Sequence, residues 1–220
     1  MDTPIEIETG ARPRAAVLWL HGLGADGRDF EPIVPELGLD ALPPIRFVFP
    51  HAPVRPVTIN AGMRMRAWYD IFQLGPGPED EAGIRASQVF LETLISREKQ
   101  RGIEAGKVVI AGFSQGGAIA LQTALRHPER LAGVLALSTY LPLSGKLAAE
   151  KSAANAAAPI FMAHGSYDDI IPIARARESR RKLEAEGYRV EWREYPMPHS
   201  VCPPEIDDLS TFLGKVLAGA

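Results

Sequence analysis

The stretch Lys107-Val108-Val109-Ile110-Ala111-Gly112-Phe113-Ser114-Gln115-Gly116-Gly117 decides the fold. Its first part contains a continuous apolar run, which is typical of a strand buried on both faces. The next part has the form G-x-S-x-G, and a helical pattern begins at Gln115. A serine between such a strand and such a helix stands on a sharp, exposed turn. Ser114 is therefore the candidate nucleophile.

Glycines on both sides explain why a serine can occupy that turn. Side chains two residues away in either direction would collide, and Gly112 and Gly116 remove these collisions. Gly117 lets the helix start close to the sheet. The serine oxygen then lies at the positive end of the helix. The alternative is an ordinary glycine-rich turn, which the motif string alone does not exclude; the strand and helix around it favour the nucleophile.

The rest of the chain alternates short β-type runs with helical segments. This order predicts an α/β fold with a mostly parallel central sheet, helices on both faces and a single domain over residues 1–220. The expected strands are 5–8, 16–20, 46–50, 107–111, 133–137, 160–163 and 189–195. The expected helices run from near residue 79 to just before Gly102, then over 115–127, 172–186 and 205–217.

A serine hydroxyl needs a base that removes its proton. In hydrolases with this motif the acid and then the histidine follow the nucleophile along the chain. Only two of the five histidines, His164 and His199, lie well beyond the helix after Ser114. His164 precedes every plausible acid. His199 lies in a loop between the last strand and the last helix, from which an imidazole can reach over the sheet edge, and it is the predicted base.

The acid should follow the next-to-last strand, where two carboxylates, Asp168 and Asp169, are adjacent. Neighbouring side chains cannot both face His199. Asp169 is placed to cap or charge-complement the helix that starts near Pro172. Asp168 is therefore the predicted acid, which would fix the tautomer of His199 and stabilise its charged form. Asp169 remains the alternative.

An oxyanion hole requires two backbone N–H groups. One is expected from Gln115, directly after the nucleophile. The other is expected from the loop Leu20-His21-Gly22-Leu23-Gly24-Ala25-Asp26-Gly27, with Leu23 as the candidate donor. The alternative for this loop is a glycine-rich turn without a catalytic role.

These segments resemble the small carboxylesterase and acyl-protein thioesterase family, also called the phospholipase/carboxylesterase family of α/β-hydrolases. The resemblance implies the α/β-hydrolase fold without a large separate cap domain, and it supports the same triad and oxyanion donors. The segments that carry it are Leu20-His21-Gly22-Leu23-Gly24, Pro50-His51-Ala52-Pro53, Ala67-Trp68-Tyr69-Asp70, Gly112-Phe113-Ser114-Gln115-Gly116-Gly117 and residues 164–172.

The same resemblance implies hydrolysis of short- to medium-chain carboxylic esters, and in some members of acyl thioesters or lysophospholipids. It makes a homodimer an expectation, because family members are often dimers. Ser166 stands where eukaryotic thioesterase-like members tend to carry an acidic residue. Two alternatives stay open: another acyl hydrolase or acyltransferase on the same triad, and a non-catalytic acyl-binding domain.

Residues 53–78 form a long segment rich in Pro, Gly and Met with little periodicity. We expect it to line an acyl pocket or to form a partial lid, with substrate contacts from Met63, Met65, Trp68 and Phe72. The alternative is that these side chains only cover the core.

Composition excludes several other classes. Among the 220 residues the net charge is −3 and basic side chains are interspersed with acids, so no nucleic-acid partner is expected. No apolar run is long enough for membrane insertion, and no signal peptide is visible, which makes a cytoplasmic location the expectation. The single cysteine, Cys202, rules out an internal disulfide. No metal or cofactor motif is found, so no metal and no cofactor are expected.

Overall fold

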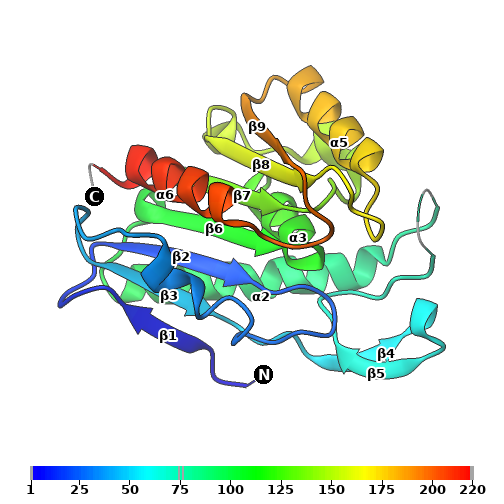
Figure 1. Cartoon of the computed structure of the whole chain (residues 1–220), viewed down its shortest axis with the longest axis horizontal. Helices are drawn as coiled ribbons and strands as arrows, with labels where there is room; N and C mark the ends of the chain where they lie inside the picture. Colours follow the sequence, from blue (N-terminus) through cyan, green and yellow to red (C-terminus); the bar gives the residue numbers. More distant parts are fainter. Residues whose placement is uncertain (1, 74, 76, 219–220) are drawn as a thin grey trace.

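A seven-stranded, mostly parallel sheet forms the centre of the protein (Figure 1). The computed structural model describes residues 2–73, 75 and 77–218. The strand order is β1-β3-β2-β6-β7-β8-β9, and within the described residues only β1 runs antiparallel to its neighbour in this sheet. The predicted fold class and all seven predicted strands are confirmed. The strands are β1 Ile5–Glu8, β2 Ala15–Leu20, β3 Ile45–Phe49, β6 Val108–Phe113, β7 Gly133–Leu137, β8 Ile160–Gly165 and β9 Val190–Tyr195.

Helices cover both faces because the central strands present apolar side chains on each side. On β2, Leu18 and Leu20 pack toward the core shared with α2, α3 and α5, whereas Val17 and Trp19 pack toward α1 and α6 (Figure 1). The helices are α1 Ile33–Glu36, α2 Glu81–Gln100, α3 Gln115–Ala124, α4 Leu147–Glu150, α5 Ile173–Ala185 and α6 Pro203–Leu217. Short 3-10 turns are η1 Thr58–Asn60, η2 Ala105–Lys107, η3 Ser144–Lys146 and η4 Ala153–Asn155.

Several helix ends differ from the sequence prediction by one to three residues. The helix predicted over 115–127 stops at Ala124, before the proline at position 128. The last helix starts at Pro203 rather than at residue 205, because proline is well suited to the first position of a helix, where its missing N–H has no intrahelical acceptor.

The segment expected to be irregular contains a two-stranded hairpin, β4 Val54–Val57 and β5 Met63–Arg66. The hairpin lies beyond the main sheet near the carboxyl ends of its strands (Figure 1). Pro56 lies within β4, and a proline argues against a strand in the sequence because it has no N–H to donate. It is tolerated here because the strand does not need that N–H.

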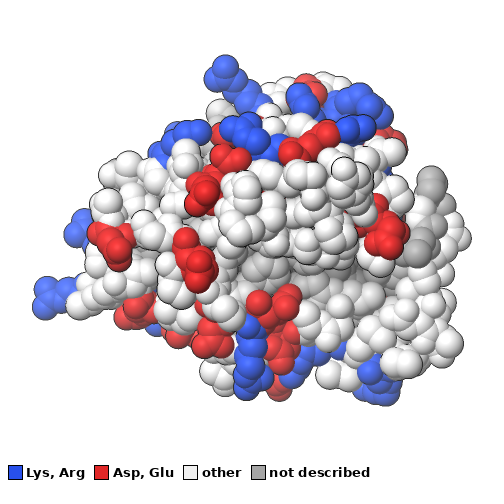
Figure 2. Space-filling view, viewed as in Figure 1, with Lys and Arg blue, Asp and Glu red and all other residues white. Residues whose placement is uncertain are grey.

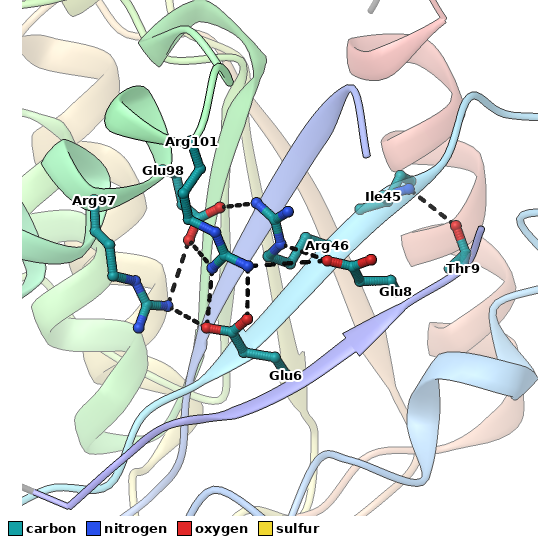
Figure 3. Close-up of polar contacts among 8 residues, drawn as sticks. All are labelled: Glu6, Glu8, Thr9, Ile45, Arg46, Arg97, Glu98 and Arg101. Carbon is teal, nitrogen blue, oxygen red and sulfur yellow. Dashed lines mark hydrogen bonds and ion pairs between the residues drawn. The ribbon is translucent and has the colours of Figure 1, made fainter. Parts of the chain in front are cut away.

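A cluster of charged side chains ties the end of α2 to the strands at one edge of the sheet (Figure 3). The Glu98 side chain is fully buried and accepts hydrogen bonds from Arg46 at 2.6 Å, Arg101 at 3.0 Å and Arg97 at 3.4 Å. Arg46 also donates to Glu8 at 2.9 Å. Each buried charge therefore faces an opposite charge, which is the condition under which buried ions are tolerated.

We expect Glu98→Ala to lower the free energy of unfolding by about 3–5 kcal/mol, because it leaves the buried guanidinium of Arg46 without its main partner. Urea denaturation followed by circular dichroism measures this. Glu184→Ala is the control: it removes the surface ion pair with Arg180 and should leave the midpoint close to wild type. Equal midpoints for the two variants would contradict the assigned role of Glu98.

Acidic and basic side chains alternate over the molecular face in Figure 2, with a broad uncharged area between them. No single-signed patch covers that face, in agreement with the interspersed charges of the sequence. No helix in the described part of the chain combines the length and apolarity needed to cross a membrane.

Candidate active site

Ser114 lies on the turn between β6 and α3, with φ 55° and ψ −120°. A positive φ is rare for a residue with a side chain and costs about 1–3 kcal/mol, so the surrounding structure must enforce it. The backbone N–H of Ser114 donates to Leu137 O at 2.8 Å, and the hydroxyl of Thr139 donates to Ser114 O at 2.6 Å. Strand β7 and the residues after it therefore hold the strained turn from both sides.

The glycines around Ser114 are required by close backbone packing. A Cβ on Gly112 would lie 2.3 Å from the carbonyl carbon of Gly116, and one on Gly116 would lie 2.3 Å from Leu20 O. A Cβ on Gly117 would lie 2.8 Å from Gly112 O. These distances are far below van der Waals contact, so the role predicted for the three glycines is confirmed.

The predicted base and acid are in direct contact. His199 Nδ1 lies 2.7 Å from Asp168 Oδ2. Because an ionised carboxylate only accepts, Nδ1 carries the proton and Nε2 is left as the acceptor. The imidazole also lies against Phe113, with ring centroids 4.7 Å apart, and Phe113 directly precedes Ser114.

The structure thus brings His199 beside the serine turn, but no hydrogen bond joins Ser114 Oγ to His199 among the residues it describes. Catalytic hydrogen bonds of a free enzyme often become short only when substrate binds.

Three N–H donors hold the buried carboxylate of Asp168. Its Oδ1 accepts from the N–H groups of Ile170 at 3.0 Å and Ile171 at 2.8 Å. Its Oδ2 contacts His199 and, at 3.2 Å, His164 Nε2. Asp169 is exposed. Of the two adjacent acids, only Asp168 is therefore oriented toward the imidazole.

His164 is a contributor that sequence reasoning left without a role. Its Nε2 lies 2.7 Å from the carbonyl oxygen of Ile171, which fixes a proton on that nitrogen. Burial lowers the pKa of His164, so the ring stays neutral at physiological pH. The N–H of His164 is directed at Ile171 O, and the neutral ring lies 3.2 Å from Asp168 Oδ2 without cancelling the charge of that carboxylate. The only sequence signal was the position of His164 at a strand end beside the two acids.

The loop after β2 runs directly past the serine. A Cβ on Gly22 would lie 3.4 Å from Ser114 Cβ. His21 holds this loop: its Nδ1–H donates to Gly22 O at 2.7 Å and its Nε2 accepts from Ala52 N at 3.0 Å. Burial lowers the pKa of His21 to about 4, so this arrangement persists at neutral pH.

The two predicted oxyanion donors, Leu23 and Gln115, each directly follow a residue of the serine turn or of the loop beside it. Gln115 is the first residue of α3, where an N–H has no intrahelical acceptor. Leu23 follows Gly22, and no backbone or side-chain acceptor is found for its N–H within the described residues. Neither N–H group is therefore engaged by an acceptor among the described residues.

The side chain of Gln115 has a second task that the motif did not reveal. Its Oε1 accepts from Trp68 N at 2.8 Å, and its Nε2 donates to Tyr69 O at 2.7 Å. Residues 68–69 form no strand, so these two hydrogen bonds hold their backbone against the start of α3.

The four predicted substrate contacts occupy different environments. Trp68 is a core residue, which corrects its prediction as a pocket wall: its Nε1 donates to His21 O at 2.9 Å and its ring stacks on Phe90. Met63 is 64% exposed on the hairpin. Met65 is half-buried, with Sδ 3.8 Å from a Cβ placed on Gly24.

Phe72 is 41% exposed. It lines a small cavity together with Tyr140 and Arg175. Leu74, in the same predicted segment, lies outside the described residues. The segment is thus partly core cover and partly surface, and residues from both its first and its second half border cavities.

The described residues hold no group of three or more His, Cys, Asp or Glu side chains that could bind a metal ion. Cys202 is half-buried at the start of α6.

Glu205, in the first turn of α6, is a buried acid close in sequence to the His199 loop. Its carboxylate has no side-chain partner among the described residues. Burial raises the pKa of Glu205 to about 8, so the group is protonated at neutral pH. The folded protein then binds a proton that the unfolded chain releases above about pH 4.5.

We expect the free energy of unfolding to fall between pH 6.5 and 8, because over this range folded Glu205 holds a proton that the unfolded state has lost. His21 acts in the opposite direction at lower pH: the unfolded state binds a proton below about 6.5 that the folded state refuses down to about 4. Between about pH 4.5 and 6.5 the effects of Glu205 and His21 oppose each other, so the free energy of unfolding should depend less on pH there than between pH 6.5 and 8.

Glu205→Gln should flatten the alkaline part of this curve, since glutamine imitates the protonated acid. Urea denaturation at a series of pH values measures the change. Glu104→Gln, on an exposed residue, should keep the wild-type slope. An unchanged slope in Glu205→Gln would show that another group causes the loss.

The parallel sheet, the strained serine turn and the loops at its carboxyl edge define a serine hydrolase of the α/β-hydrolase fold. The sequence model described as Phospholipase/Carboxylesterase matches residues 3–217, and the chain belongs to this family, whose members act on carboxylic esters.

Individual relatives agree with this membership. The chain is 41% identical over 224 residues to acyl-protein thioesterase 1 of Neurospora crassa, covering 97% of this chain and 91% of that protein. It is 38% identical to acyl-protein thioesterase 1 of Mycosarcoma maydis, covering 97% and 95%. The crystal structure of Zea mays acyl-protein thioesterase 2 superposes with a TM-score of 0.87 at 29% identity, covering 99% of this chain and 100% of that one.

Proposed function

We propose that the protein is a serine carboxylesterase that cleaves short- to medium-chain carboxylic esters and thioesters through Ser114, His199 and Asp168. The observation that carries the proposal is the 2.7 Å contact between Asp168 and His199 beside the strained serine turn. The contact leaves His199 Nε2 as the acceptor, which is the state a base requires.

In the proposed reaction Ser114 Oγ attacks the acyl carbonyl carbon while His199 Nε2 takes the hydroxyl proton. The N–H groups of Leu23 and Gln115 stabilise the resulting oxyanion. Collapse of the tetrahedral intermediate expels the alcohol or thiol, which receives the proton from His199 and leaves an acyl-enzyme. Water, deprotonated by His199, then cleaves the acyl-serine bond and releases the carboxylic acid.

The relatives named acyl-protein thioesterase support thioesters as one substrate class. Lysophospholipids are a further candidate, because they also present a carboxylic ester. A panel of matched esters, thioesters and peptide amides separates this proposal from another acyl hydrolase or an acyltransferase on the same residues.

We expect Ser114→Ala to lower kcat for p-nitrophenyl butyrate by a factor on the order of 10⁴ or more, because the acyl-enzyme cannot form. Labelling by a fluorophosphonate should disappear with it. Ser166→Ala, an exposed serine in the loop after β8, is the control and should behave as wild type. Persistent labelling of the Ser114 variant would refute the assignment.

Adjacent acids offer a matched pair of variants. Asp168→Asn should reduce kcat by roughly 10³–10⁴, because an amide no longer enforces the required tautomer of His199. Asp169→Asn removes the same charge one residue away and should leave kcat nearly unchanged, since Asp169 is exposed. Steady-state kinetics with p-nitrophenyl acetate compares them, and equal losses would speak against Asp168 as the acid.

A further inference from the structure

The loop after β2 makes a tight turn over residues 22–25, and the candidate oxyanion donor Leu23 is the second residue of this turn. The N–H of Ala25 donates to Gly22 O at 3.3 Å, which closes the turn. Gly24, the third residue, has φ 79°, a conformation that favours glycine. The direction of the backbone at Leu23 is therefore set by the peptide groups on either side of it.

The peptide group before Leu23 carries the candidate donor. Its carbonyl oxygen is Gly22 O, and its N–H is that of Leu23. In a planar trans peptide these two groups point in opposite directions, so a contact that fixes the carbonyl also fixes the N–H. The imidazole of His21 makes such a contact, because its Nδ1 lies 2.7 Å from Gly22 O.

The fold gives the imidazole of His21 one tautomer and one charge. Its Nε2 accepts from the N–H of Ala52 at 3.0 Å, which leaves the proton on Nδ1. Burial lowers the pKa of His21 to about 4, so the ring is neutral at physiological pH. The ring also packs against that of Trp68, with centroids 5.2 Å apart. At this position His21 can therefore only donate to Gly22 O.

Other parts of the turn are anchored without the imidazole. The N–H of Gly24 donates to the carbonyl oxygen of Arg66, in β5, at 2.8 Å. The backbone carbonyl of His21 accepts from Trp68 Nε1 at 2.9 Å. A substitution of the His21 side chain thus leaves both anchors in place.

We propose that His21 is a positioning residue of the oxyanion hole: by holding Gly22 O, it directs the N–H of Leu23 at the oxyanion that forms during ester cleavage. The inference rests on the proposed esterase function and adds to it a side chain that acts through a peptide group. A hydrogen bond to the carbonyl oxygen also polarises this peptide, which makes its N–H a stronger donor.

Two substitutions separate the roles of the two ring nitrogens. His21→Asn keeps an amide N–H in the place of Nδ1 but loses the acceptor for Ala52 N. His21→Gln keeps an amide oxygen in the place of Nε2 but loses the donor to Gly22 O. Each variant loses one hydrogen bond and the ring that packs on Trp68, so the two should be destabilised to a similar degree.

We expect His21→Gln to lower kcat for p-nitrophenyl butyrate by about ten- to a hundredfold with little change in KM, because an oxyanion donor acts in the transition state and is here misdirected rather than removed. His21→Asn should lose far less, since its amide can still donate to Gly22 O. Acylation and deacylation both pass through an oxyanion, so kcat falls whichever step is rate-limiting.

Inhibition by hexyl trifluoromethyl ketone gives a readout that does not depend on turnover. The ketone adds to Ser114 as a hemiketal whose oxyanion occupies the same hole. Its Ki should rise in His21→Gln by the factor by which kcat/KM falls, and much less in His21→Asn. Labelling to completion with a fluorophosphonate counts the active sites, so that misfolded enzyme does not enter either value.

His127→Gln is the control. It replaces a buried histidine beyond the far end of α3, whose ring nitrogens have no hydrogen-bond partner among the described residues. Its kcat and Ki should match those of wild type.

Equal changes of kcat and Ki in His21→Asn and His21→Gln would overturn the proposal, because the imidazole would then only support the fold. Long-range proton–nitrogen NMR of the wild-type protein with nitrogen-labelled histidine tests the tautomer without any variant: a His21 proton on Nε2 would also overturn it. Failure of the esterase function itself would appear separately, as butyrate hydrolysis that survives Ser114→Ala.

Discussion

The site depends on one backbone constraint, the positive φ of Ser114. A residue with a side chain adopts this conformation only where packing leaves no alternative. Here α3 starts so close to β6 and β2 that a Cβ on Gly116 would lie 2.3 Å from the carbonyl oxygen of Leu20. Relaxing the turn would push α3 off the sheet and open the core between them. The apolar surface buried between helix and sheet thus stabilises the strained serine.

That constraint also organises the residues around the serine. The same short approach of α3 places the amide of Gln115 where it can bind residues 68–69. Trp68 in turn donates to the carbonyl of His21, at the base of the loop that carries Leu23. A chain of buried hydrogen bonds therefore links the helix start to the oxyanion loop, so the two proposed donors are held in register by one network.

The fold could be predicted from the sequence because its strands are continuous apolar runs and its helices have clear periodicity. Ser114, Asp168 and His199 were predicted from their order and from the loops that they occupy, and the structure places Asp168 and His199 in contact. The environments of the side chains in residues 53–78 were harder to predict. Trp68 is an aromatic residue of a type common in pockets, but its position in the core is fixed by hydrogen bonds to Gln115 and His21. Each of these bonds joins residues more than 40 positions apart in the sequence.

Two neutral histidines near the site, His21 and His164, have supporting roles that the local sequence does not reveal. His21 and His164 each donate to a backbone carbonyl, and burial lowers the pKa of both. Protonating His164 would place a cation beside Asp168 and weaken the attraction of that carboxylate for His199. Desolvation of His164 therefore keeps the negative charge of Asp168 directed at one imidazole. The electrostatic asymmetry between two histidines on one carboxylate follows from burial: the side chain of His164 is enclosed, and that of His199 reaches the surface.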